Sequence, residues 1–386
     1  MTVTADQLIA DVRELAPRIA ARASEIEARR TVPTDIIDQL RDIGVFRMIT
    51  PKAYGGLELS LPDFASVITA VAAADGSVGW AVMIGCGTAL LYSRLPKKSF
   101  DEIFAQGPDV IQAGTVHGMG AAEIVDGGYR VTGRWPFASG SPHADWILGG
   151  CKIMKNGEPV LGPNGQPIER IVTLPASAWT IEDTWHVSGL RGSGSNHVSI
   201  KDTFVPEGMV FDLAGPSCIE GPFYGSVGAI IPFFHAAFAD GIAEGAHADI
   251  CALAGTGKQQ YRTRAAMREQ PIFQYELGRA QGDLRAARAY LKTQADSHWQ
   301  RALSGTLGDP AAFFDAMQMN VWVTEAATRV VDKCYTLGGG TSLYDSSPLQ
   351  RRLRDIHTAT QHMVSSQRHY TSAGALAIGM PPTSFA

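Results

Sequence analysis

YTLGGGTSLYDSSPLQRRLRDIHTATQH, from Tyr335 to His362, is the stretch that decides the fold of this chain of 386 residues. A turn of three glycines and a short polar loop with Pro348 lead into an arginine-rich helix start. If residues 352–369 are helical, polar side chains recur along one stripe of that helix at spacings of seven, four and three. The members of this stripe are Asp355, His362, Ser366 and His369. Such a stripe is either a solvated face or the lining of a functional site.

The composition is that of an ordinary globular protein, with 45% hydrophobic residues and a mean hydropathy of -0.01. A formal net charge of -5 argues against nucleic acid as a partner. The most apolar stretch, residues 79–91, is interrupted by glycines and a cysteine, so no membrane span is expected. The N-terminus lacks a secretion signal pattern, and the five cysteines are scattered. We therefore expect a cytoplasmic protein with reduced cysteines and no metal site.

Periodicity divides the chain into three parts. Apolar residues recur every three or four positions near the N-terminus and again along residues 277–291, which indicates helices. Between them, segments such as AAEIVDGGYRVTGRW alternate apolar and polar residues and are separated by turn residues, which indicates antiparallel strands. The sequence thus predicts an α+β protein with an N-terminal helical domain (1–110), a middle β-barrel or sandwich domain (111–212) and a C-terminal helical domain (213–386).

Four segments in order carry a resemblance to a known family. They are AYGG (53–56), GRWPFASG (133–140), GLRGSGSNHVSIKDTFVP (189–206) and the run 338–355. Each resembles a landmark of the acyl-CoA dehydrogenase family, and together they span nearly the whole chain. The resemblance implies the acyl-CoA dehydrogenase-like fold, with a C-terminal four-helix bundle and a homotetrameric assembly.

The catalytic glutamate of that family is missing at both of its customary positions. Many dehydrogenases carry it one or two helical turns beyond the Arg-Asp pair, where this chain has His362 and Met363. Others take it from an earlier helix, where the best match is His235. An imidazole is no obvious substitute for a carboxylate that removes a proton next to a thioester. Asp240 keeps an acyl-CoA dehydrogenase or a flavin oxidase open as the alternative.

The segment from Trp135 to Trp146 is similar instead to the flavin-dependent two-component monooxygenases, the group of the 4-hydroxyphenylacetate hydroxylases. In that group a serine lies beside flavin N5, and Ser139 matches it. Reduced flavin and dioxygen form a C4a-hydroperoxyflavin, whose lifetime depends on keeping the N5 proton and excluding water. A hydroxyl that accepts from N5–H in a dry site would prolong that lifetime. The alternative is that Ser139 only belongs to a polar turn before Pro142.

The resemblance also assigns roles to two histidines. Hydroxylases of this group place a histidine beside flavin C4a, and His362 matches it, either as a hydrogen-bond donor to the peroxide or as the acceptor of the substrate proton. His117, in AGTVHGMG, is a candidate for binding a phenolic or heteroaromatic hydroxyl, or else a surface residue. The phenol hydroxylases carry a further substrate-binding histidine on the helix that matches residues 79–91, and this chain has none there. That difference predicts a larger and more apolar substrate.

Cofactor binding is expected at three places. Arg191, Ser193 and Ser195 lie in a glycine-rich loop whose N–H groups and hydroxyls would reach the phosphate or the ring edge. The chain has no GxGxxG fingerprint, so reducing equivalents must come from a separate NAD(P)H:flavin reductase. The segment that lies against the flavin ring in the family is matched by Trp135, Phe137 and Ser139. The family residues that contact a neighbouring subunit's cofactor are matched by Arg262, Gln274, Gly338 and Gly339. Helix capping is the alternative role for these four residues.

These observations predict the oxygenase component of a two-component flavin-dependent monooxygenase. It would use reduced FAD or FMN and dioxygen to hydroxylate an aromatic or heteroaromatic small molecule. A catalytically silent flavin-binding or assembly scaffold is the alternative outside enzymes. The sequence does not decide between FAD and FMN, or between oxygenation at carbon, nitrogen or sulfur.

Overall fold

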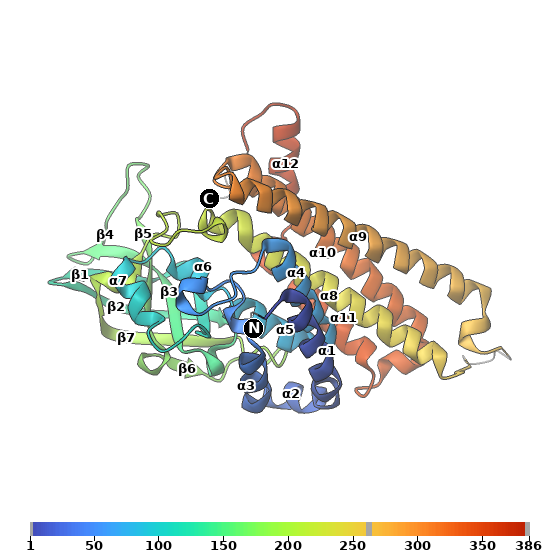
Figure 1. The fold of residues 1–386 in the computed structure, drawn as a ribbon. Helices are drawn as coiled ribbons and strands as arrows, with labels where there is room; N and C mark the ends of the chain where they lie inside the picture. Colours follow the sequence, from blue (N-terminus) through green and yellow to red (C-terminus); the bar gives the residue numbers. More distant parts are fainter. Residues whose placement is uncertain (1–2, 260–264, 383–386) are drawn as a thin grey trace.

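A computed structural model describes residues 3–259 and 265–382 of the chain. It has three parts: short N-terminal helices, a β-sheet at one end of the molecule, and long helices that extend to the other end (Figure 1). The fold that the sequence predicts, helical, then β, then helical, is confirmed. The predicted boundaries at residues 110/111 and 212/213 fall just before the first long strand and just after the last short one.

The N-terminal part holds seven α-helices within the described residues. They are α1 (Ala5–Ala21), α2 (Ala23–Arg29), α3 (Thr34–Ile43), α4 (Leu61–Ala74), α5 (Gly76–Gly85), α6 (Thr88–Tyr92) and α7 (Lys97–Ile103). Asp75 caps the start of α5, because its carboxylate accepts hydrogen bonds from the backbone N–H groups of Ser77 and Val78. This helix is apolar and buried almost all round, so it lies inside the molecule rather than on its surface.

One sheet of eight strands forms the middle part, in the order β6-β7-β2-β1-β3-β5-β8, with β4 paired to β3. The strands are β1 (Gln112–Val125), β2 (Gly128–Ala138), β3 (Trp146–Lys155), β4 (Glu158–Pro159), β5 (Glu169–Pro175), β6 (Thr180–Glu182), β7 (Asn196–Pro206) and β8 (Val210–Phe211). All neighbours are antiparallel except β1 and β3, which run parallel and so differ from the prediction. The reason is that β2 runs back antiparallel to β1, and the chain then crosses to the other side of β1, where β3 begins in the same direction as β1.

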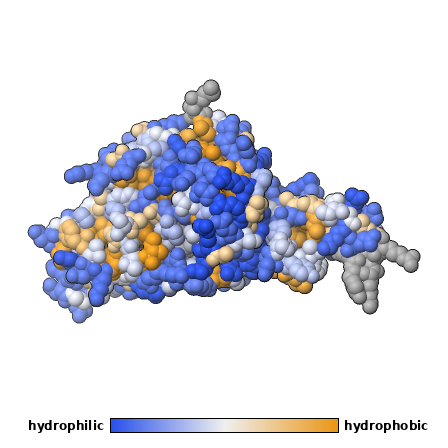
Figure 2. Space-filling model, turned by 90° about the horizontal axis from the view of Figure 1, so that it is seen from below, coloured by the Kyte–Doolittle hydropathy of each residue, from blue (hydrophilic) through white to orange (hydrophobic). Residues whose placement is uncertain are grey.

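The long helices form the third part: α8 (Val227–Gly255), α9 (Pro271–Leu303), α10 (Pro310–Gly338), α11 (Pro348–Ala359) and α12 (His369–Ala377). Helix α8 lies in the centre and packs against α4, α9, α10 and α11. It is long and apolar enough to cross a membrane by length and composition alone, but most of it is buried inside the protein, as expected of a core helix. The outward faces of the protein are largely hydrophilic in the view of Figure 2, with apolar patches over the sheet end.

The C-terminal helix is shorter than the sequence predicts. The expected helix over residues 352–369 ends at Ala359; a three-residue 3-10 helix (Met363–Ser365) follows, and the next α-helix begins at His369. The hydroxyls of Thr358 and Thr360 donate to the carbonyls of Arg354 and His357, a local bonding pattern that competes with continued helix. His362 therefore lies in an extended turn with ψ 137°, and Asp355 and His362 do not share a helix face.

Candidate active site

Three aromatic side chains from distant parts of the sequence meet where α5, α8 and the turn after α11 come together. The rings of His235 and His362 stack with centroids 4.3 Å apart and an interplanar angle of 28°. Trp80 packs edge-on against both, at 5.4 Å from His235 and 5.8 Å from His362. The two histidines that stand at the expected glutamate positions are thus direct neighbours.

A chain of buried hydroxyls begins at the same tryptophan. Trp80 Nε1 donates to Ser139 Oγ at 2.9 Å, Ser139 Oγ lies 2.7 Å from Ser195 Oγ, and Ser195 Oγ lies 2.7 Å from Ser193 Oγ. An indole N–H can only donate, so one lone pair of Ser139 is used by Trp80. If Ser139 donates its own proton to Ser195 Oγ, the second lone pair of Ser139 Oγ stays available for another donor. The three predicted serines are brought together, and Trp80, which lies in the apolar stretch 79–91 and was not among the predicted site residues, connects them to the histidines.

The hydrogen bonding of His362 defines which ring nitrogen carries its proton. The backbone N–H of Val364 donates to His362 Nδ1 at 3.3 Å, so the proton of the neutral ring sits on Nε2. Burial, and then the nearby charge of His117, lower the pKa of His362 to about 4. His362 is therefore neutral at physiological pH and offers an Nε2–H donor.

His117 lies close enough to His362 to influence it but is not part of the ring cluster. It is exposed on β1, where the pairing with β3 shifts register between Thr115 and Gly118. Gly150 opposite allows this bulge, because an added Cβ there would lie 2.4 Å from the His117 carbonyl group. The structure thus places His117 at the open side of the site and His235 at its buried side.

The loop from Gly189 to Ser195 is held tightly against the helices. Leu190 N–H donates to Asp355 Oδ1 at 2.6 Å, and a Cβ on Gly189 would come within 2.0 Å of the Arg354 carbonyl oxygen. Within the described ranges, the enclosed Nε of Arg191 has no hydrogen-bond partner. The guanidinium belongs to the same loop as Ser193 and Ser195, and its positive charge would favour an anionic cofactor group.

Phe137 has the conformation expected of a residue that meets a ligand. Its backbone φ of 64° lies in the left-handed region, which bulky residues rarely adopt, and its ring is 64% exposed. The ring of Phe137, two positions before Ser139 in the chain, contacts Trp185 edge to face with centroids 6.3 Å apart. An exposed aromatic face beside the hydroxyl chain fits a flat isoalloxazine ring, so the residues present suit a flavin.

Trp135 was predicted to lie against the cofactor, and the structure contradicts this. Its indole is fully buried in the sheet, with Nε1 donating to the Gly150 carbonyl at 2.7 Å. Glycines make room for it, since a Cβ on Gly149 would lie 2.7 Å from the ring. Residues 135 and 137 would share one face of a regular strand, but the pairing of β2 with β7 shifts register between Trp135 and Ala138, and Phe137 has a left-handed backbone. Trp135 therefore stays in the core, where its role is structural, while Phe137 is exposed.

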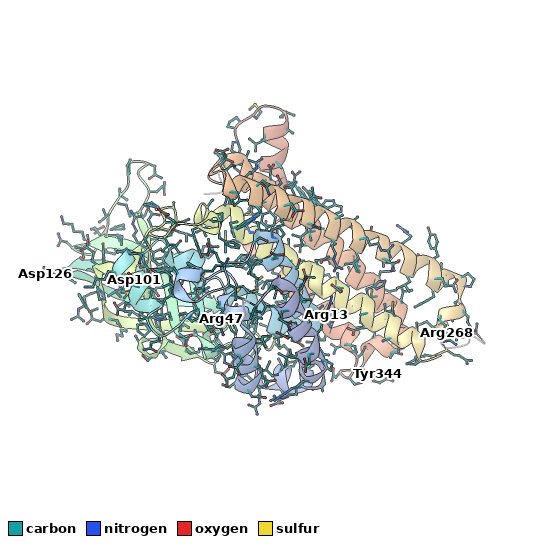
Figure 3. The ribbon with its side chains drawn as sticks, viewed as in Figure 1. Arg13, Arg47, Asp101, Asp126, Arg268 and Tyr344 are labelled. Carbon is teal, nitrogen blue, oxygen red and sulfur yellow. The ribbon has the colours of Figure 1, made fainter. Side chains whose placement is uncertain are left out.

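The predicted contacts to a neighbouring cofactor lie at the far end of the helices. Gln274 near the start of α9 donates to the Arg268 carbonyl at 2.8 Å, and Gly338 and Gly339 mark the end of α10. Figure 3 shows Arg268 and Tyr344 at this end and Asp126 at the opposite, sheet end. One protomer does not bring Gln274 or these glycines to Ser139, so they stay a prediction for another copy of the chain. Arg262 lies outside the described residues.

Asp240, the alternative base, is occupied elsewhere. Arg288 of α9 pairs with its carboxylate at 2.9 Å, and burial raises the pKa of Asp240 to about 6. Asp240 follows His235 by five positions in α8, so the two side chains lie on different faces of this helix. Asp240 therefore joins α8 to α9 and does not face the histidine pair.

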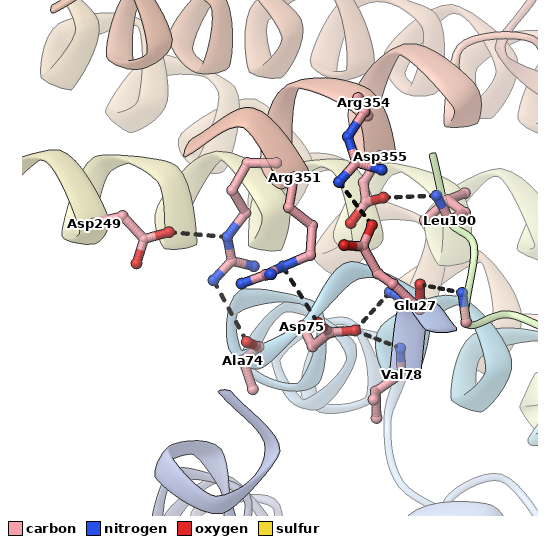
Figure 4. Close-up of polar contacts among 12 residues, drawn as sticks. Glu27, Ala74, Asp75, Val78, Leu190, Asp249, Arg351, Arg354 and Asp355 are labelled. Atoms are coloured by element: carbon pink, nitrogen blue, oxygen red, sulfur yellow. Dashed lines mark hydrogen bonds and ion pairs between the residues drawn. The ribbon is translucent and has the colours of Figure 1, made fainter. Parts of the chain in front are cut away.

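Two buried carboxylates lie behind the loop, as Figure 4 shows. Asp75 has Arg351 at 3.9 Å, while Asp355 Oδ2 has no hydrogen-bond partner among the described residues. Burial, and then the neighbouring Asp75, raise the pKa of Asp355 to about 7. Asp355 therefore connects the cofactor loop to α11 as a largely neutral group in mildly acidic solution.

Asp355→Asn should change how stability depends on pH. The folded protein keeps the Asp355 proton up to about pH 7, whereas the unfolded chain loses it near 3.8, so this group's contribution is full at low pH and falls as pH rises through that window. The stability of the wild type relative to the variant should fall by up to about 1.4 kcal/mol per pH unit. Urea unfolding of both proteins between pH 4.5 and 8 measures this difference, and parallel curves would contradict it.

Among the described residues, no group of three or more histidine, cysteine or acidic side chains is arranged to hold a metal ion. Two surface cavities, of about 290 and 180 Å³, lie along α8 and α9 and beside the start of α11, apart from the histidine pair.

Comparison with known proteins agrees with this geometry. Residues 2–94 and 233–367 match the N-terminal and C-terminal domain families of acyl-CoA dehydrogenases. The chain is 32% identical over 370 residues to the indole-3-acetate monooxygenase of Pseudomonas putida, covering 95% of this chain and 92% of that protein. It is 30% identical over 385 residues to the oxygenase subunit HsaA of a flavin-dependent monooxygenase of Rhodococcus jostii, covering 96% and 97%. The structure of XiaF from Streptomyces sp., in complex with FADH2 and glycerol, superposes with a TM-score of 0.91 at 25% identity, covering 98% and 97%.

Proposed function

Because the chain belongs to the acyl-CoA dehydrogenase-like family of oxygenase components of two-component flavin-dependent monooxygenases, we propose that it hydroxylates an aromatic or heteroaromatic small molecule with reduced FAD or FMN and dioxygen. The chain is a flavin-dependent monooxygenase, and an oxygenase component requires a flavin reductase as its partner. We further propose that this reductase is a separate NAD(P)H-dependent protein, that the oxygenase is a homotetramer, and that it acts in the cytoplasm.

The observation that carries the proposal is the connection of Ser139 to the histidine pair through Trp80. One side of the indole touches the rings of His235 and His362, and its N–H donates to Ser139. A hydroxyl and a neutral imidazole therefore face one region from two different domains. Within the described part of the chain, no carboxylate is among the charges that act on either ring of the histidine pair.

Bound reduced flavin would supply the two electrons with which one atom of dioxygen enters the substrate and the other leaves as water. Ser139 would accept a hydrogen bond from the N–H of the ring edge with its remaining lone pair. Trp80 and Ser195 hold the hydroxyl in that orientation, because one donates to it and the other can accept from it. All three groups are buried, so water does not compete for these bonds.

His362 would act as a hydrogen-bond donor rather than as a base. Its Nδ1 is occupied by the Val364 N–H, and its depressed pKa leaves little tendency to take up a proton. The Nε2–H is free to bond the oxygen that is being transferred or a hydroxyl of the substrate. His117 on the open side is placed to contact the substrate as it enters.

The surroundings favour a flat apolar substrate. Trp80 and Phe238 pack edge to face at 5.1 Å beside the histidines, and the exposed side chains of Phe137 and Met363 lie next to Ser139 and His362 in the chain. Aromatic and methionine surfaces bind aromatic rings well. Relatives of this chain include an indole-3-acetate monooxygenase and the oxygenase component of a p-hydroxyphenylacetate 3-hydroxylase, which supports an aromatic substrate.

A direct test supplies the protein with a flavin reductase, NADH, FAD or FMN, and a panel of indoles and phenols under air. We expect oxygenated product from at least one aromatic compound, and no reduction of bound flavin by acyl-CoA thioesters without oxygen. Flavin reduction by a thioester with no oxygenation of any aromatic compound would favour the dehydrogenase.

Ser139→Ala should uncouple oxygen consumption from product formation while flavin binding changes little. Loss of one hydrogen bond to the ring edge costs on the order of 1 kcal/mol or more, which corresponds to roughly tenfold more hydrogen peroxide per product formed. Oxygen uptake and product measured together give this ratio. Ser141→Ala is the matched control, because that buried hydroxyl bonds the Gly194 carbonyl and is outside the chain of serines. Equal ratios in both variants would assign Ser139 to the turn alone.

A further inference from the structure

His235 is a buried imidazole whose nitrogens have no partner in the protein. Only 4% of its surface is exposed. Within the described ranges, neither ring nitrogen of His235 forms a hydrogen bond. Neither nitrogen is among the unpaired side-chain atoms that the protein encloses completely. Both nitrogens therefore reach the small accessible part of the site. A buried polar side chain without a partner in the protein calls for a partner from outside it.

Another buried histidine shows what a structural role looks like in the same bundle. His298 of α9 is fully buried, and both its nitrogens are paired, Nδ1 with the Gln294 carbonyl at 3.0 Å and Nε2 with the Ala312 carbonyl at 2.8 Å. Its ring also packs on Phe233. His235 has the same aromatic packing but neither hydrogen bond, so packing alone does not explain an imidazole at this position.

The neighbours of His235 keep its ring fixed and uncharged. His362 stacks on one face and Trp80 contacts it edge-on, which leaves the ring plane little freedom. Burial and the adjacent His362 hold the pKa of His235 well below its usual range. A fixed neutral imidazole presents one N–H donor and one acceptor nitrogen, and the acceptor nitrogen requires an O–H or N–H group as its partner.

We propose that His235 is a substrate-binding residue that accepts a hydrogen bond from a phenolic O–H or a heteroaromatic ring N–H, beside the donor of His362. This inference rests on the proposed function and narrows its substrate class. The substrate is an aromatic ring with a neutral proton-donating group at the position that meets the histidine pair. An aromatic compound in which that group is methylated lacks the bond, although its shape is nearly the same.

Binding of paired probes tests the role of His235 independently of turnover. Indole is compared with 1-methylindole, and phenol with anisole, by tryptophan fluorescence of the protein with reduced flavin under anaerobic conditions. We expect the wild type to bind the O–H or N–H member of at least one pair about tenfold more tightly, the value of one hydrogen bond. His235→Phe keeps an aromatic ring and should lose this preference, whereas His235→Asn keeps an acceptor and should retain most of it.

The control is His298→Phe, which removes a paired histidine away from the site and should leave the preference intact even if stability falls. Equal binding of both members of each pair by the wild type, or no binding of any probe, would overturn the proposal. Retention of the preference in His235→Phe would do the same. A wrong monooxygenase assignment would give a different result. The protein would then oxygenate no aromatic compound, although its binding would still distinguish the two members of a probe pair through His235.

Discussion

His362→Ala is expected to lower product formation by about a hundredfold or more, the usual scale for removing a positioned acid, base or donor at a reaction centre. The variant should still fold, because His362 lies in a turn and supports only a three-residue helix. It should also still bind reduced flavin, since the serine chain and Arg191 are untouched. Single-turnover assays with reduced flavin and the substrate identified for the wild type measure the effect.

Two further variants make the His362 result specific. His357→Ala removes a histidine of α11 that pairs with Asp332 at 2.8 Å on the outer surface. This variant should form product at the wild-type rate. His362→Glu places a carboxylate where many dehydrogenases carry one, and we expect neither oxygenation nor acyl-CoA oxidation. Wild-type turnover by His362→Ala would remove His362 from the mechanism and make His117 the next candidate.

Arg352→Ala is expected to destabilise the folded protein by about 3 kcal/mol or more, the scale for breaking a buried ion pair. The guanidinium donates to Asp249 at 3.1 Å and to the carbonyls of Ala72 and Ala73 at 3.1 and 2.6 Å. Figure 4 labels Asp249 and Ala74, the last residue of α4. These carbonyls belong to the last turn of α4 and have no helical partners. Truncation therefore leaves a partly buried carboxylate and a helix end unpaired.

The midpoints of urea unfolding, compared at one pH, measure the loss. Arg352→Lys should recover only part of it, because an ammonium cannot reach the carboxylate and the carbonyls with a planar fork. Arg13→Ala is the control for removing an exposed arginine, labelled in Figure 3, and should shift the midpoint little. Equal midpoints for Arg352→Ala and Arg13→Ala would show that Arg352 does not join the domains.

The sequence was most informative where backbone geometry and periodicity are local. The order of helical and β parts follows from the periodicity of apolar side chains. The tight turn at Gly189 follows from the space that a residue without a Cβ leaves. Ser139, Ser193 and Ser195 were found because their segments carry family landmarks, and they do form one hydrogen-bonded chain. The end of α11 was missed, since the residue pattern of 352–369 is compatible with a helix and only local hydroxyl bonds stop it at Ala359.

By itself the sequence determined the fold class, the missing glutamates and the chemistry that the serines and His362 can offer. Only the tertiary structure decided which of these groups meet. Strand alternation alone would put residues 135 and 137 on one face, and only the irregular pairing before Ala138 and the left-handed backbone of Phe137 separate the buried Trp135 from the exposed Phe137. Contacts between α5, α8 and the turn after α11 join residues more than a hundred positions apart, and no local pattern encodes them. Those contacts place Trp80 between Ser139 and the stacked pair of His235 and His362, and they leave Asp240 to Arg288 on another face.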